Sequence, residues 1–122
     1  MAHELDRGEL ESALGLPRRV LRQCAASCEE ALHDYVSRFG LRADHQLFRE
    51  LIPAIATVQI AADLLENDRS RALVLRLAHE ACRRAALECR RYGLDEPLFR
   101  SAAECDRAMS EIELHMTAAV HD

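Results

Sequence analysis

The chain has 122 residues, of which 49% are hydrophobic and 30% charged, and this composition is typical of one folded, soluble domain. Four Gly, three Pro and 4% aromatic residues are too few turn and strand formers for a β-sandwich or a β-barrel. The formal net charge is −5 and all sixteen basic residues are Arg, and this acidic balance argues against a nucleic-acid partner.

The N-terminal segment predicts a short helix of its own. Residues 4–14 have an amphipathic pattern, and Gly15 and Pro17 follow them. Proline suits the first turn of a helix, where its missing N–H would have no partner. We therefore expect an N-terminal helical extension over residues 1–17, followed by a second unit over residues 18–122.

Two long helices are expected in the first half of that unit. The first covers residues 18–38 and stops before Gly40, a residue type that favours helix C-termini. The second covers residues 45–66, and Asp44 stands where an N-cap is needed.

Two further helices follow after short turns. One covers residues 69–92 and stops at Gly93, and the other covers residues 96–119 with Asp95 as its N-cap. Short loops favour antiparallel neighbours. The predicted fold class is therefore all-α: an antiparallel up-down-up-down four-helix bundle with a short extra N-terminal helix.

The five cysteines all fall on the apolar, inward-facing sides of these helices. Cys24 and Cys28 are one turn apart on the first helix, Cys82 and Cys89 share the third, and Cys105 lies on the fourth. The second helix has no cysteine. We expect free thiols, because the chain has the features of a cytoplasmic protein and five is an odd number.

The expected heights of these residues follow from a rise of ~1.5 Å per residue. Cys24 should lie just below the middle of the bundle, and Cys89 should lie higher and apart from the other thiols. A single mid-bundle layer is expected to hold Cys28, Cys82, Cys105 and Met109, with His79 at a similar level.

Inward-facing sulfur ligands favour soft metal ions. Thiolates select Cu(I) or Zn(II) over hard cations, and a thioether from Met109 favours Cu(I), so Zn(II) is the second choice. The alternative is packing alone, because a free cysteine behaves as a small hydrophobic residue and is often buried. Both interpretations stay open on the spacing of the thiols.

Several segments resemble the four-helix-bundle copper storage proteins. The similar segments are QCAASCEEAL (23–32), AADLLENDRSRALVL (61–75), EACRRAALECRRYG (80–93) and AAECDRAMSEI (102–112). The resemblance covers about residues 18–116. It implies a bundle whose inward thiols bind Cu(I) ions.

The chain departs from that family by having apolar or small residues where the family repeats cysteine. Examples are Leu21 and Ala31 on the first helix, Ala85 on the third and Ser101 on the fourth. The resemblance therefore implies a small capacity of two to four Cu(I) ions, in place of the larger load of the family.

Three off-face leucines on the third helix, Leu73, Leu77 and Leu87, predict a second buried surface. It would face the N-terminal helix or another subunit, so we expect a homo-oligomer. No apolar run approaches the ~18 residues needed to span a bilayer, and the N-terminus has no signal-peptide pattern, so no membrane partner is expected.

The resulting hypothesis is a cytoplasmic, non-enzymatic protein that sequesters a few Cu(I) ions. Its ligands would be Cys24, Cys28, Cys82 and Cys105, with Met109, His79 and Cys89 as further candidates. The alternative is a metal-free bundle that acts as an interaction or scaffold protein. A thiol redox enzyme is the third option, and it would need an exposed thiol of lowered pKa.

Overall fold

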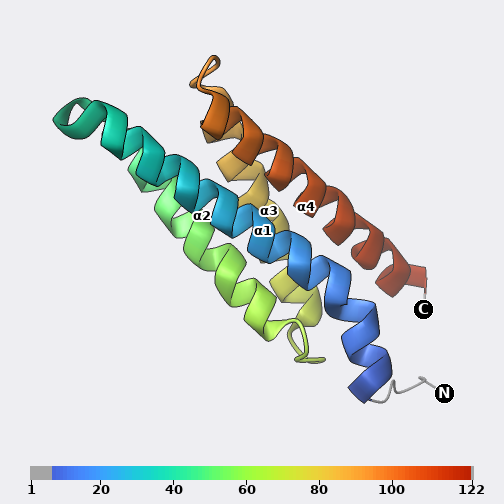
Figure 1. Ribbon diagram of the computed structural model, residues 1–122. Coiled ribbons are helices and arrows are strands. Elements are labelled where there is room, and N and C mark those ends of the chain that lie inside the picture. Colours follow the sequence, from blue (N-terminus) through green and yellow to red (C-terminus); the bar gives the residue numbers. More distant parts are fainter. Residues whose placement is uncertain (1–6, 122) are drawn as a thin grey trace.

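A computed structural model describes residues 7–121, and they form four long helices packed side by side (Figure 1). The elements are α1 (Arg7–Phe39), the short 3₁₀ helix η1 (Gly40–Arg42), α2 (His45–Leu64), α3 (Arg71–Arg90) and α4 (Glu96–His121). Each helix packs against the next in the chain, α4 also packs against α1, and α2 lies diagonally opposite α4. The predicted antiparallel four-helix bundle is confirmed.

The start of α1 differs from the prediction. A separate N-terminal helix ending before Gly15 is absent from the described residues, because α1 runs without a break from Arg7 through Gly15 and Pro17. Leu14, Pro17 and Leu21 are all buried, so the apolar stripe of the helix continues across the expected break. Burial of the proline ring offsets the one backbone hydrogen bond that proline cannot make. The part of the predicted helix before Arg7 lies outside the described residues.

The predicted capping residues are confirmed, although α2 and α3 are each shorter than the predicted ranges 45–66 and 69–92. Gly40 and Gly93 have positive φ angles of 52° and 32°, in the left-handed region that favours glycine. The Asp44 carboxylate accepts a hydrogen bond from the Gln46 backbone N–H at 2.9 Å, at the start of α2. Asp95 does the same for Leu98 at 3.2 Å in α4. Each cap satisfies a backbone donor that the helix itself leaves unpaired.

The core is unevenly built from the four helices. The buried face of α2 includes Leu47, Leu51 and Val58, and it provides aliphatic volume. The buried face of α3 has more alanine residues, and all five buried cysteines lie on α1, α3 and α4. The thiols are therefore concentrated on the side of the core away from α2.

The three off-face leucines of α3 are not buried against the N-terminal part of α1. Leu73, Leu77 and Leu87 are about half exposed (52–54%), so that part of the prediction is wrong for this chain by itself. Among the residues that the structure describes, no helix combines the length and apolar character needed to cross a membrane.

Candidate metal centre

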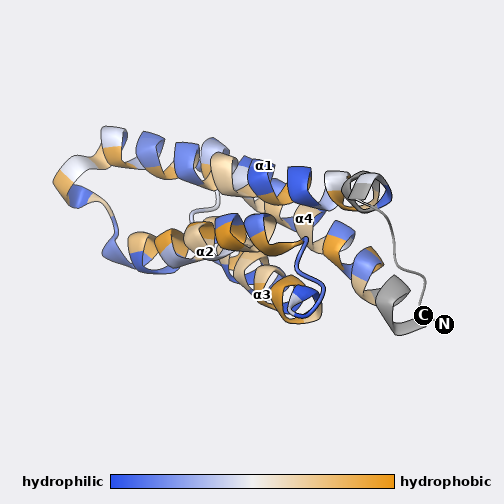
Figure 2. Cartoon of the chain, turned by 90° about the horizontal axis from the view of Figure 1, so that it is seen from below, coloured by the Kyte–Doolittle hydropathy of each residue, from blue (hydrophilic) through white to orange (hydrophobic). Residues whose placement is uncertain are grey.

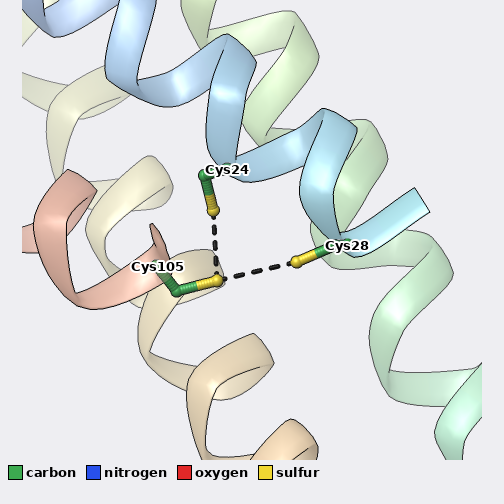
Figure 3. A group of neighbouring side chains, drawn as sticks. All are labelled: Cys24, Cys28 and Cys105. Carbon is green, nitrogen blue, oxygen red and sulfur yellow. Dashed lines mark hydrogen bonds between the residues drawn. The ribbon is translucent and has the colours of Figure 1, made fainter. Parts of the chain in front are cut away.

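The candidate site is a group of thiols in the middle of the bundle, contributed by three helices. Cys24 and Cys28 project from one face of α1 because they are four residues apart, which is close to one helical turn. Cys105 projects toward them from α4 (Figure 3). All five cysteines are free and buried, each at most 2% exposed.

Cys105 is the meeting point of this group. Its Sγ atom lies 3.1 Å from Sγ of Cys24 and 3.6 Å from Sγ of Cys28, as drawn in Figure 3. The three sulfur atoms all lie within 4.8 Å of one another, close enough to bind one metal ion together. The structure thus brings together three of the predicted ligands.

The two cysteines of α3 extend the group on either side. Sγ of Cys82 lies 3.8 Å from Sγ of Cys24, and Cys28 is near enough to Cys89 to raise the pKa of its thiol. Four thiols therefore form a continuous chain in the order Cys82, Cys24, Cys105 and Cys28, and Cys89 lies near the Cys28 end.

This order corrects two predicted positions. Cys89 lies nearer to Cys28 than predicted, and Cys82 lies against Cys24, one turn from the position predicted for it. One cause is that α3 begins at Arg71 and not at residue 69, which lowers Cys82 by ~3 Å along the helix.

The sulfur separations are close to those of a shared metal ion. Two sulfurs bound at ~2.3 Å to one tetrahedral ion lie about 3.8 Å apart. The Cys24–Cys82 distance of 3.8 Å and the Cys28–Cys105 distance of 3.6 Å already have this spacing. The Cys24–Cys105 pair, at 3.1 Å, would have to open by under 1 Å, within reach of side-chain rotation.

The hydrogen bonds within the cluster favour a single thiolate, on Cys105. Hydrogen bonds with the thiols of Cys24 and Cys28 lower the pKa of Cys105 to about 6. The same hydrogen bonds raise the pKa of Cys24, chiefly through Cys105, and burial raises it further. The pKa of Cys89 is raised by its hydrogen bond to Cys28 and by burial. Ionisation of the cluster is therefore easiest at Cys105, whereas Cys24 and Cys89 hold their protons until a cation replaces them.

A pair of serines lies beside the thiols and was not anticipated. The Ser101 hydroxyl donates to the Ser27 backbone carbonyl at 2.9 Å, and the two hydroxyl oxygens are 3.1 Å apart. Ser101 is fully buried, and this contact gives its hydroxyl group the hydrogen-bond partner that a buried polar group needs. The predicted inward position of Ser101 is correct, but only the packing of α4 on α1 reveals its partner.

The two non-cysteine candidates lie differently from the thiols. His79 Nε2 is 2.8 Å from Glu113 Oε1 at the surface between α3 and α4, so its polar end is directed to a carboxylate. Met109 is partly buried, packs against the core and follows Cys105 by one turn of α4. A ligand role for Met109 or His79 stays a prediction.

Comparison of the chain with protein families, with characterised proteins and with solved structures finds no match. The function of the thiol cluster is therefore inferred from its own geometry and chemistry.

Proposed function

We propose that this bundle binds Cu(I) through its buried thiols and holds the metal away from water. The observation that carries the proposal is the placement of Cys24, Cys28 and Cys105 with their sulfur atoms within 4.8 Å of one another. Three sulfur ligands at this spacing suit a soft metal ion with a low coordination number. Their burial would protect bound Cu(I) from water.

The linear order of the five thiols supports more than one ion. Cys82 lies next to Cys24 at one end and Cys89 next to Cys28 at the other, so the central sulfur of Cys105 can be shared. Two Cu(I) ions would each find two or three sulfur ligands in this chain. This number agrees with the small capacity implied by the resemblance to copper storage proteins.

Cu(I) is preferred to Zn(II) as the metal. A structural Zn(II) site uses four ligands in a tetrahedron. The compact group here has three sulfurs, with the fourth and fifth attached at opposite ends. Cu(I) accepts sulfur ligands readily, and Met109 offers a thioether on the same helix as Cys105. Nothing in the proposal requires turnover, and we assign the protein a sequestering role in the cytoplasm.

The direct test is a titration of the fully reduced protein with Cu(I) in competition with a Cu(I) chelator, in the absence of oxygen. We expect tight binding beyond one equivalent, saturating near two. The variant with Cys24, Cys28, Cys82 and Cys105 all replaced by alanine should lose it. Ser101→Ala is the matched control, because it alters a buried polar residue beside the thiols and removes no sulfur.

A metal-free scaffold is the competing function, and the same titration separates the two. If the protein binds Cu(I) no more tightly than the four-alanine variant does, the Cu(I) proposal is wrong. Parallel titration with Zn(II) tests the choice of metal, because Zn(II) binding that Cu(I) does not displace would overturn it. Circular dichroism of each variant checks that the helices have formed.

A further inference from the structure

The outer face of α2 carries an apolar surface that the four-helix bundle does not use. Residues 51–62 contain no charged side chain, although half of this helix faces outward. Ile52 and Ile60 are 53% and 57% exposed, and Leu64 is 42% exposed. Figure 2 shows hydrophobic ribbon segments along α2, whereas the outer turns of α1 are mostly hydrophilic.

This face borders a groove between α1 and α2. The groove has a volume of about 530 Å³ and is walled by Leu32 and Val36 of α1 and by Phe48, Ile52 and Ile55 of α2. Its lining is chiefly apolar, and Glu29, His33 and Gln59 are its polar members. A ridge of aliphatic side chains from another molecule would fit such a groove.

The residues of this face are arranged symmetrically about Ala56. Ile52 and Ile60 lie four residues on either side of Ala56, and Arg49 and Asp63 lie seven residues on either side. At 100° per residue, all of these side chains fall within ~40° of the direction of Ala56, which is itself exposed. Phe48 and Leu64 lie eight residues away on opposite flanks. The face thus has the small side chain of Ala56 at its midpoint and an isoleucine on either side of it. Its two ends carry opposite charges.

A face of this kind is complementary to a second copy of itself. We propose that two copies of the chain dimerise by antiparallel packing of α2 on α2, with the two-fold axis passing beside Ala56. In this arrangement Ile52 of each copy meets Ile60 of the other, and Arg49 meets Asp63 of the other. An isologous interface requires this reciprocity. The small side chain of Ala56 lets the two helices approach closely where they cross.

The charges at the ends fix the direction of pairing. A parallel arrangement would bring Arg49 against Arg49 and Asp63 against Asp63, whereas the antiparallel one pairs opposite charges twice. Asp63 already accepts a hydrogen bond from Arg22 of its own chain at 2.8 Å, through one oxygen, and its side chain is 65% exposed. Its carboxylate therefore stays accessible to Arg49 of a second copy.

The first test compares matched apolar-to-charged variants by sedimentation equilibrium of the reduced, full-length protein. We expect wild type to dimerise and Ile52→Glu and Ile60→Glu each to raise the dissociation constant by ~10-fold or more, because each buries an unpaired charge twice. Leu114→Glu is the control, since Leu114 is 66% exposed on α4, diagonally opposite α2. A wild-type protein that is monomeric at all concentrations would overturn the proposal. A dimer that persists in both isoleucine variants but is lost in Leu73→Glu on α3 would also overturn the proposal.

Charge exchange tests the pairing of Arg49 with Asp63. Arg49→Asp and Asp63→Arg should each weaken the homodimer, because like charges then meet at both ends. An equal mixture of the two variants should form a heterodimer in which both pairs are again opposite. Failure of the mixture to associate more tightly than either variant alone would contradict the antiparallel arrangement.

Cross-linking tests the position of the two-fold axis. Ala56→Cys places one thiol of each copy beside the axis, so mild oxidation should join the dimer covalently through these residues. Leu73→Cys, on the outer face of α3, should give no such product. Cross-linking of equal efficiency at both positions would show that association does not centre on Ala56.

Discussion

Sγ of Cys24 and Sγ of Cys105 lie 3.1 Å apart, although 81 residues separate them in the chain. The contact joins the first helix of the bundle to the last, and Cys105 also contacts Cys28 one turn further along α1. Cys105 is the only one of these three thiols on α4, and its sulfur atom lies against the sulfur atoms of both others. Removing it separates the cluster more completely than removing any other thiol.

Cys105→Ser should consequently cause the largest loss of Cu(I) affinity of any single cysteine substitution. We expect a decrease of ~100-fold, against ~10-fold for Cys89→Ser, because Cys89 lies at the edge of the thiol cluster, near Cys28 alone. Chelator competition with each reduced variant measures both values. Similar losses for the two variants would show that Cys105 is not shared between ions.

Cu(I) binding should strengthen as the pH rises from 6 to 8. The pKa of Cys105 is lowered to about 6 by hydrogen bonds from Cys24 and Cys28, so this ligand is largely ionised at neutral pH. The pKa values of Cys24 and Cys89 are raised, because each thiol donates to a neighbouring sulfur and is buried, so these ligands hold their protons across the whole range. Each proton that the metal displaces strengthens binding about tenfold per pH unit.

The measurement is the Cu(I) affinity at pH 6, 7 and 8, corrected for the protonation of the competing chelator. Proton release on metal addition in a weakly buffered solution gives an independent value. An affinity that does not change with pH would mean that Cys24 and Cys89 are already ionised in the metal-free protein, contrary to their raised pKa values.

The helices and their inward faces could be predicted from local signals. Gly40, Asp44, Gly93 and Asp95 mark ends that depend on backbone conformation and capping, both of which are properties of a few adjacent residues. The beginning of α1 could not be predicted in this way. Gly15 and Pro17 are local signals for a break, but the burial of Pro17 in the assembled bundle outweighs them.

The identity of the site residues could be predicted, but their neighbours could not. Helical spacing correctly turned all five cysteines inward. Which thiol touches which depends on the vertical offset between helices, and an error of one turn exchanges one neighbour for another. That offset is set by loop lengths and core packing, so the spacing along single helices does not predict that Cys82 lies against Cys24 or that Ser27 contacts Ser101.

Asp44 should be the most important polar residue for the stability of the end of the bundle at which α2 begins. Its carboxylate accepts from the Gln46 N–H at 2.9 Å and from the Tyr92 hydroxyl at 2.8 Å, and its own N–H donates to the Tyr35 hydroxyl at 3.2 Å. Asp44→Ala removes the helix cap and leaves the Tyr92 hydroxyl without this acceptor. We expect the free energy of unfolding to fall by about 1–2 kcal/mol.

Urea denaturation of the reduced protein measures this loss, and Asp68→Ala is the control. Asp68 is highly exposed and pairs only locally with Arg71, so its removal should change stability by ~0.5 kcal/mol or less. The pKa of Asp44 is lowered, first by the Gln46 N–H and then by Tyr92. Its stabilisation is therefore complete above the ordinary carboxyl pKa and is lost as the pH falls through the lowered value. Equal denaturation midpoints for Asp44→Ala and Asp68→Ala at pH 7 would contradict this role.

His79→Gln distinguishes a surface ion pair from a metal ligand. The Nε2 atom of His79 is directed to Glu113 on α4, and its side chain is 28% exposed, whereas the thiols are buried. Because the pair lies at the surface, we expect a stability change below ~1 kcal/mol and a Cu(I) affinity within ~2-fold of wild type. Met109→Leu in the same titration provides the comparison, since it removes the thioether nearest to Cys105 along α4 and keeps the apolar volume. A loss of Cu(I) affinity of ~10-fold or more in His79→Gln would instead place this imidazole among the ligands and require it to leave Glu113 when the metal binds.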